Sequence, residues 1–151
     1  MTVLTGSCHC GNIKLRFETS LHPSDLKLRA CDCSFCRKHG VRSVMDPNGA
    51  ARIEVADKRE LSRYVFGLRT AEFLVCKRCG VYAGAVLRDG GSTWAVVNAN
   101  LLDGDALAND AVRSSYGAET AGGRIDRRKR EWTPARIEVG QRAGGAGVLN
   151  G

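Results

Sequence analysis

The seven cysteines of this chain constrain its fold more than any other feature of the sequence. They fall into three tight clusters: Cys8 and Cys10, then Cys31, Cys33 and Cys36, then Cys76 and Cys79. Cysteines one or two positions apart can hold one cation through neighbouring thiolates, whereas disulfide frameworks usually join distant segments. An odd number also cannot be consumed by pairwise oxidation. The pattern therefore predicts metal binding. Zinc is the expected ion, because thiolate-rich tetrahedral sites select zinc or iron and iron–sulfur clusters normally need four cysteines in longer local runs.

A count of seven suggests one closed site with four thiolates and a second site with three. Joining the first cluster to the third closes a long loop, which predicts a structural zinc held by Cys8, Cys10, Cys76 and Cys79. The middle cluster would then hold a second zinc through Cys31, Cys33 and Cys36. Its fourth position would be left to water, a substrate thiol or a nearby histidine.

Spacing alone leaves two alternatives open. Cys33 and Cys36 could pair with Cys76 and Cys79 as one zinc-ribbon site, which would leave no obvious chemistry. Alternatively, His39, three positions after Cys36, could complete the second site and make it purely structural.

The chain has the size of one ordinary domain, with 151 residues of which 43% are hydrophobic. We expect a zinc-binding domain over residues 1–142 and a flexible C-terminal tail over 143–151, which is rich in glycine and alanine. The N-terminus has no apolar stretch of signal-peptide length, and no segment approaches the ~18 apolar residues that span a bilayer. We therefore expect a cytoplasmic protein without a membrane partner, in a compartment where thiols stay reduced.

Alternation of apolar and charged residues predicts half-buried strands at 13–18, 26–30 and 52–56. The segments 81–87 and 93–98 flank turn residues at 89–92 and predict a β-hairpin. Helical patterns are scarce, and only short turns are expected, at 34–39 and 103–112. The chain is therefore predicted to be mainly β, with few short helices.

The formal net charge of +7 favours acidic small molecules or nucleic acid as partners. Part of the excess lies in the run at 124–130 (RIDRRKR), whose ordinary interpretation is a solvated helix face or loop. A zinc-stabilised module that binds nucleic acid is an alternative function, but the chain lacks the interleaved aromatic residues that base stacking needs. A non-catalytic module that binds a protein partner is another, and it would need no open zinc position. No feature of the sequence indicates an oligomeric state.

Three motifs in order carry a resemblance: GSCHCG at 6–11, CDCSFCRKHG at 31–40 and CKRCG at 76–80. They resemble the glutathione-dependent formaldehyde-activating enzyme and centromere-protein-V-like family, over most of the chain up to the WTP at 132–134. The resemblance implies an Mss4-like fold of mostly antiparallel sheet with two zinc ions. It also implies that the first and third clusters form the structural site and that the middle cluster is the site associated with glutathione. Arg37, Lys38 and His39 stand where enzymes named for formaldehyde activation tend to carry a Trp-Lys-Pro type sequence, so the chain resembles the broader branch of the family.

The resemblance implies a carbon–sulfur lyase type of reaction, in which a thiol such as glutathione adds reversibly to formaldehyde or another small aldehyde. A free thiol is only a few per cent ionised at pH 7, and zinc coordination deprotonates it. Cys31, Cys33 and Cys36 would act in catalysis through this zinc, with His39 as a candidate for proton transfer. Arg37 and Lys38 could bind the carboxylates of glutathione. Three aromatic residues could line a pocket, although such residues on strands more often belong to the core: Phe35, Tyr82 and Trp94.

Overall fold

The computed structural model describes residues 1–104 and 108–140, and these residues are mainly β, as predicted. The described strands are β1 (Thr2–Ser7), β2 (Ile13–Thr19), β3 (Leu28–Cys31), β4 (Ser43–Val44), β5 (Ala50–Val55), β6 (Leu61–Tyr64), β7 (Glu72–Cys76), β8 (Tyr82–Asp89), β9 (Ser92–Asn98), β10 (Ala111–Ser114) and β11 (Thr133–Val139). The α-helices are α1 (Ser34–His39) and α2 (Ala121–Glu131), and short 3-10 turns include η1 (Pro23–Asp25), η2 (Lys58–Glu60) and η3 (Ala99–Leu101). The predicted tail at 143–151 lies outside the described residues, so the domain boundary at 142 stays a prediction.

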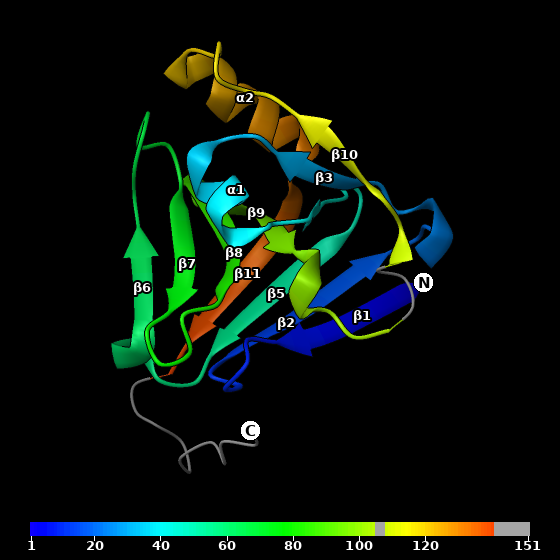
Figure 1. Cartoon of the computed structure of the whole chain (residues 1–151), viewed down its shortest axis with the longest axis vertical. Helices are drawn as coiled ribbons and strands as arrows, with labels where there is room; N and C mark the ends of the chain where they lie inside the picture. The colour runs from blue at the N-terminus through cyan, green and yellow to red at the C-terminus, as the bar shows by residue number, and fades with distance from the viewer. Residues whose placement is uncertain (105–107, 141–151) are drawn as a thin grey trace.

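The strands form one branched sheet in the order β1-β2-β5-β11-β9-β4-β3-β10, and β8, β7 and β6 extend from β9 as a branch (Figure 1). Most neighbouring pairs are antiparallel, as predicted. Two pairs are parallel, β5 with β11 and β3 with β10. Both pairs bring late segments of the chain onto early ones, which local sequence patterns do not reveal.

The predicted alternation of buried and exposed residues is present in β2. Ile13, Leu15 and Phe17 are buried, whereas Lys14 and Arg16 between them are exposed. The strands predicted at 26–30 and 52–56 are also found, as β3 and β5 with slightly shifted bounds. Period-two patterning therefore placed these strands correctly. Burial alternates along β2 and β5, each of which has one face on the core and one toward water, whereas no residue of β3 is exposed.

The hairpin predicted at 81–98 is formed by β8 and β9, which pair up to Asp89 and Ser92. The two residues of its turn, Gly90 and Gly91, have φ values of 59° and 81°. Positive φ at both central positions matches the twist of the flanking strands and favours glycine. β8 is buried on both faces from Tyr82 to Leu87, so it forms the centre of the fold.

The two α-helices begin and end at recognisable capping residues. The sulfur of Cys33 caps α1, and Gly40 ends it in the left-handed conformation. The Thr120 hydroxyl caps α2 by accepting a hydrogen bond from the Gly123 N–H at 3.1 Å. The helical turn predicted at 103–112 lies partly outside the described residues. The prediction is wrong at its C-terminal end, because strand β10 begins at Ala111. Pairing with β3 overrides the local preference there.

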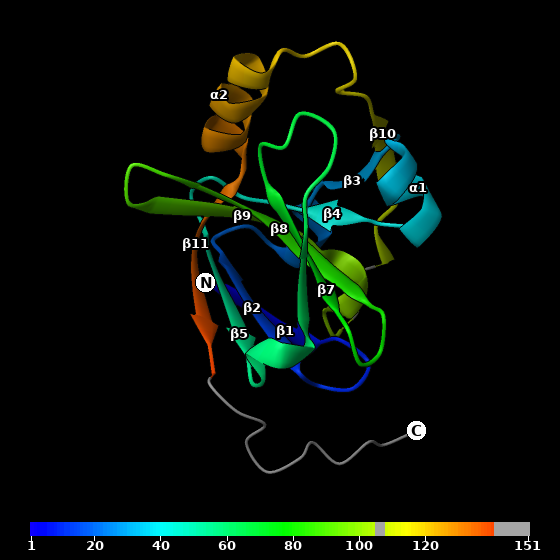
Figure 2. The same cartoon turned by 90° about the vertical axis from the view of Figure 1, so that its left-hand side faces the viewer.

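The core consists of apolar side chains between the strands, with Phe17, Ile53 and Leu74 fully buried. A second cluster includes Trp132, which follows α2 and packs among residues of β8 and β9. This contact fixes α2 at one end of the sheet. Figures 1 and 2 show α1, α2, β10 and the loop between β6 and β7 gathered at that same end. Neither described helix is both long and apolar enough to cross a membrane.

Candidate functional site

The first and third cysteine groups of the sequence lie together in the fold. We call them the four-cysteine cluster: Cys8, Cys10, Cys76 and Cys79. Their sulfur atoms lie within 4.8 Å of one another, with 3.8 Å between Cys8 and Cys10 and 3.5 Å between Cys10 and Cys76. Four thiolates at the usual zinc–sulfur bond length stand about 3.8 Å apart on a tetrahedron. The donors and their spacing therefore fit a closed zinc site. The alternative grouping of Cys33 and Cys36 with the third cluster does not occur.

Two tight turns position this cluster, one after β1 and one between β7 and β8. Gly11 and Gly80 have φ values of 83° and 78°, which glycine adopts without steric cost. The N–H of Ile13 donates to the Cys8 sulfur at 3.3 Å. Backbone N–H groups that face sulfur stabilise a thiolate, so the turns prepare the sulfurs for a cation.

Burial and hydrogen bonding act in opposite directions on the acidity of the four thiols. Burial raises the pKa of Cys8, and it raises the pKa of Cys76 to about 12. Burial also opposes ionisation of Cys79, but hydrogen bonds from the backbone of Cys10 and Val81 outweigh it and lower the pKa of Cys79 to about 7. A thiolate is therefore more favourable at Cys79 than at Cys8 or Cys76.

The remaining cysteines form the three-cysteine cluster: Cys31, Cys33 and Cys36. β3 ends at Cys31, Cys33 caps α1, and Cys36 lies in the first turn of that helix. The three sulfur atoms lie within 4.8 Å of one another. The N–H of Cys36 donates to the Cys33 sulfur at 3.4 Å. A strand end followed by a capped helix thus turns three thiols of one short segment toward one point.

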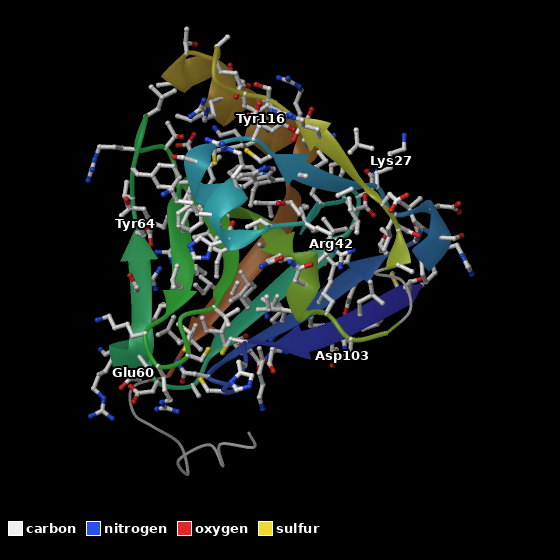
Figure 3. All side chains as sticks on the ribbon, in the orientation of Figure 1. Lys27, Arg42, Glu60, Tyr64, Asp103 and Tyr116 are labelled. Carbon is white, nitrogen blue, oxygen red and sulfur yellow. The ribbon has the colours of Figure 1, made fainter. Side chains whose placement is uncertain are left out.

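One of the three thiols, Cys33, ionises more readily than the other two. Hydrogen bonds from Cys31 and then from Cys36 lower the pKa of Cys33 to about 2. Hydrogen bonding with Cys33 raises the pKa of Cys31, and hydrogen bonding with Cys31 and then with Cys33 raises the pKa of Cys36. A negative charge on Cys33 is therefore stabilised by its neighbours, and it is well placed to attract a cation. Figure 3 shows sulfur atoms in two separate parts of the fold, one near α1 and one near the ends of β1 and β7.

Three residues predicted for the site lie on the exposed side of α1: Arg37, Lys38 and His39. The His39 ring packs on Phe35, with 4.4 Å between the ring centroids. Its nitrogens do not belong to the three-cysteine cluster. The arrangement in which His39 supplies a fourth ligand is therefore not found in this structure. None of the three side chains lines the cavity described next.

A cavity of about 160 Å³ lies beside the three-cysteine cluster. All three cysteines line it. Phe66, Phe73, Tyr82 and Trp132 supply apolar and aromatic surface from the β6–β7 loop, β7, β8 and the residue after α2. Of the aromatic residues that the sequence suggested for a pocket, Tyr82 lines this cavity. Phe35 and Trp94 instead pack against apolar clusters of the fold.

Part of the cavity wall is basic, and its residues were missed by the sequence analysis. Arg29, Arg124, Arg127 and Arg128 all line it. The run at 124–130 is helical, but the prediction of a solvated face is wrong for three of its arginines. The side chains of Arg124 and Arg127 are only 17% and 11% exposed, and Arg128 is buried. The spacing of positions 124, 127 and 128 places them on one helix face, which was the available signal.

Acidic residues behind this wall hold three of the guanidinium groups in place. Glu119 accepts hydrogen bonds from Arg127 at 2.7 Å and from Arg124 at 3.3 Å. Glu131 accepts one from Arg29 at 2.7 Å. Tyr116, which Figure 3 labels beside α2, accepts a hydrogen bond from Arg29 and lies under the Arg127 guanidinium. The site therefore combines cysteine sulfurs, which can ligate a metal ion, with guanidinium groups that acidic residues hold in place.

Comparisons with known proteins agree with this arrangement. The family model described as "Glutathione-dependent formaldehyde-activating enzyme" matches residues 3–117. A solved structure of a Rhodobacter sphaeroides protein is 30% identical to this chain, covers 73% of it and 99% of that chain, and superposes with a TM-score of 0.54. The family match spans both cysteine clusters and ends before α2 begins. On this evidence the chain belongs to the glutathione-dependent formaldehyde-activating enzyme family.

Proposed function

We propose that this protein is a zinc-dependent enzyme of the carbon–sulfur lyase type. It binds a thiol such as glutathione and catalyses the reversible addition of that thiol to formaldehyde or another small aldehyde, as an S-(hydroxymethyl)glutathione synthase does. One observation carries the proposal: in a member of this family, all three sulfurs of the three-cysteine cluster line a cavity. Thiolate ligands need reduced cysteines, which supports a cytoplasmic location.

The proposal includes two zinc ions per chain. The four-cysteine cluster would hold a structural ion, and its tetrahedral spacing supports this. The three-cysteine cluster would hold the second ion with three protein ligands, as catalytic sites commonly do. When bound there, zinc supplies a positive charge that keeps an incoming thiol deprotonated at neutral pH.

The side chains around the cavity would exclude water and orient the reactants. Phe73 and Tyr82 stack with 5.8 Å between ring centroids and cover one side of the cavity. Exclusion of water from the cavity strengthens the attraction between a thiolate and the cations that line the cavity. In the addition step the sulfur attacks the aldehyde carbon, a carbon–sulfur bond forms, and the π pair of the carbonyl moves to oxygen. That oxygen takes up the proton that the thiol lost, so no oxidant is needed.

The exposed face of α1 would hold the rest of the thiol substrate. Arg37 and Lys38 lie in its last turn, directly after Cys36. We propose that they pair with the carboxylates of glutathione outside the cavity. His39, one residue further, would exchange a proton with the adduct.

A test of this function compares two cysteine variants by metal content and rate. Wild-type protein purified without chelator should contain two zinc ions and accelerate adduct formation between glutathione and formaldehyde, measured by NMR exchange spectroscopy. Cys36→Ser should retain one zinc and lose the acceleration, while Ser34→Ala on the same helix should keep both. Wild-type protein with two zinc ions and no rate above that of buffer, either with formaldehyde or with another small aldehyde such as glyoxylate, would refute the proposal.

The inward orientation of the basic run supports a small-molecule substrate over nucleic acid. Arg124 and Arg127 are paired with Glu119, and Arg128 is buried. These guanidinium groups are therefore not free to contact a phosphate backbone, which needs exposed cations.

A further inference from the structure

Two unpaired polar atoms mark the cavity as a binding site for an oxygen-rich group. Among residues 1–104 and 108–140, the buried side-chain nitrogen and oxygen atoms without a hydrogen-bond partner are Arg128 Nε and Ser114 Oγ. Both residues line the cavity. Buried polar groups in folded proteins are nearly always paired, because an unpaired one loses its hydration without compensation. Two such atoms at one cavity indicate that a ligand completes their hydrogen bonding.

Arg128 is a buried cation without an acidic partner in the described part of the chain. It is 8% exposed, and no described carboxylate lies within ion-pair distance of it. Its Nη1 donates to the Thr70 hydroxyl at 2.7 Å, and its guanidinium carbon lies 4.6 Å from the Trp132 ring centroid. Burial, followed by repulsion from Arg127 and Arg124, lowers the pKa of Arg128 to about 10. The side chain is therefore still charged at neutral pH and lacks a counter-ion.

None of the surrounding described carboxylates pairs with this positive charge. Arg124 and Arg127 are paired with Glu119, and Arg29 is paired with Glu131, which also lies 3.6 Å from Arg127. Asp32 also lines the cavity and lies 4.0 Å from Arg113. Among the arginines that line the cavity, Arg128 is thus the one whose positive charge is not paired with a described carboxylate.

Ser114 places the second unpaired atom close to the sulfurs. It lies in β10 directly opposite Cys31 of β3, and its carbonyl accepts a hydrogen bond from the Asp32 N–H at 2.9 Å. A ligand that reaches Ser114 is therefore beside the first residue of the three-cysteine cluster. Such a ligand needs acceptor oxygens for Arg128 and must be small, because the cavity holds roughly ten water molecules.

We infer that the aldehyde substrate of this protein carries a carboxylate, which binds Arg128 and Ser114 while its carbonyl carbon faces the three-cysteine cluster. This inference rests on the proposed function and names its electrophile. Formaldehyde has no anionic group that would neutralise a buried guanidinium, whereas a carboxylate carries the charge and accepts two hydrogen bonds from one. The reaction is the same addition: a carbon–sulfur bond forms, the carbonyl oxygen takes the proton released by the thiol, and the carboxylate is unchanged. The family match ends before α2, so it does not include Arg128.

The first test measures binding without reaction. Acetate, an unreactive carboxylate, is titrated into wild-type protein and followed by NMR. Arg128→Met keeps an unbranched apolar side chain and removes the charge, and it should weaken acetate binding by about 10- to 100-fold. Ser114→Ala, on a different element, should weaken it by about 2- to 10-fold. Arg130→Met changes an exposed arginine of the same helix and is the matched control. Acetate affinity that is equal in all four proteins would overturn the inference.

The second test compares rates for two aldehydes and two thiols. Glyoxylate provides a carboxylate on the aldehyde, and formaldehyde does not. Glutathione provides carboxylates on the thiol, and 2-mercaptoethanol does not. With either thiol, we expect Arg128→Met to lower kcat/KM for glyoxylate by about 10- to 100-fold more than it lowers kcat/KM for formaldehyde. A loss that follows glutathione instead of glyoxylate would overturn the inference, because the bound carboxylate would then belong to the thiol. Absence of acceleration with every pair would refute the proposed function, and acetate binding would still test the carboxylate site by itself.

Discussion

Replacing Cys79 by serine should destabilise the whole domain, because the four-cysteine cluster ties together segments that are far apart in the sequence. The sulfur atoms of Cys10 and Cys76 are 3.5 Å apart although 66 positions separate them along the chain. In a chain-entropy treatment, a cross-link that closes a loop of this length contributes about 4 kcal/mol. This contribution depends on the metal ion, because binding of a structural ion is coupled to folding. Domains of this kind are stable by only about 5–15 kcal/mol.

The matched control for this experiment is Cys36→Ser. The three-cysteine cluster lies within one short segment, so its loss removes little loop-closure entropy. For a chain of this length, about 4 kcal/mol corresponds to a decrease of roughly 8–16 °C in Tm. We expect a decrease of this order, or insoluble protein, for Cys79→Ser. We expect a soluble, folded protein with one metal ion fewer for Cys36→Ser.

The assay is calorimetric unfolding of both variants and the wild type, together with metal analysis of each preparation. Addition of a strong chelator to the wild type should reproduce the lower Tm of Cys79→Ser. The reasoning fails if the two variants unfold at the same temperature with the same loss of metal. In that case the long loop would be closed by packing alone, and the division between a structural and a reactive cluster would not hold.

Two further predictions concern stability. The hydrogen bond from Arg127 lowers the pKa of Glu119 below its ordinary value of 4.5, so this ion pair stabilises the fold above that pH and the contribution is lost as pH falls through the lowered value. Glu119→Gln should therefore lower Tm at pH 7, by an amount that corresponds to about 1 kcal/mol or less. The difference from wild type should shrink as pH falls below 4.5 and vanish once the lowered pKa has been passed; a pH-independent difference would contradict this assignment. A Cβ at Gly6 would lie 1.8 Å from the Leu101 carbonyl oxygen, whereas one at Gly122 meets nothing within 4 Å. Gly6→Ala should thus lower Tm by the equivalent of about 1–3 kcal/mol, and Gly122→Ala should raise it slightly through helix propensity; equal effects would argue against the close contact of Gly6 with Leu101.

Local patterns predicted the elements whose conformation depends on neighbouring residues. The alternation in β2 and the glycines of the β8–β9 turn are such cases, because side-chain period and allowed φ are properties of a few consecutive residues. The prediction failed at Ala111, where strand β10 replaces a helical turn. That strand pairs in parallel with β3, about eighty positions earlier in the chain, and no local pattern encodes such a partner.

The sequence alone indicated metal chemistry at the sulfur atoms, because closely spaced cysteines can ligate one ion and glycine marks the turns that follow them. Spacing left the partition of the seven cysteines open, and the fold settled it by bringing the first and third groups together. The sequence also indicated the family, through three motifs in a specific order. Only the tertiary structure decided what faces the three-cysteine cluster. Arg128 and Ser114 come from α2 and β10, and they reach the cavity because Trp132 packs on the sheet and β10 pairs with β3. A charged run on one helix has the same sequence pattern whether it faces water or a cavity. Burial, which depends on contacts between distant segments, distinguishes the two cases.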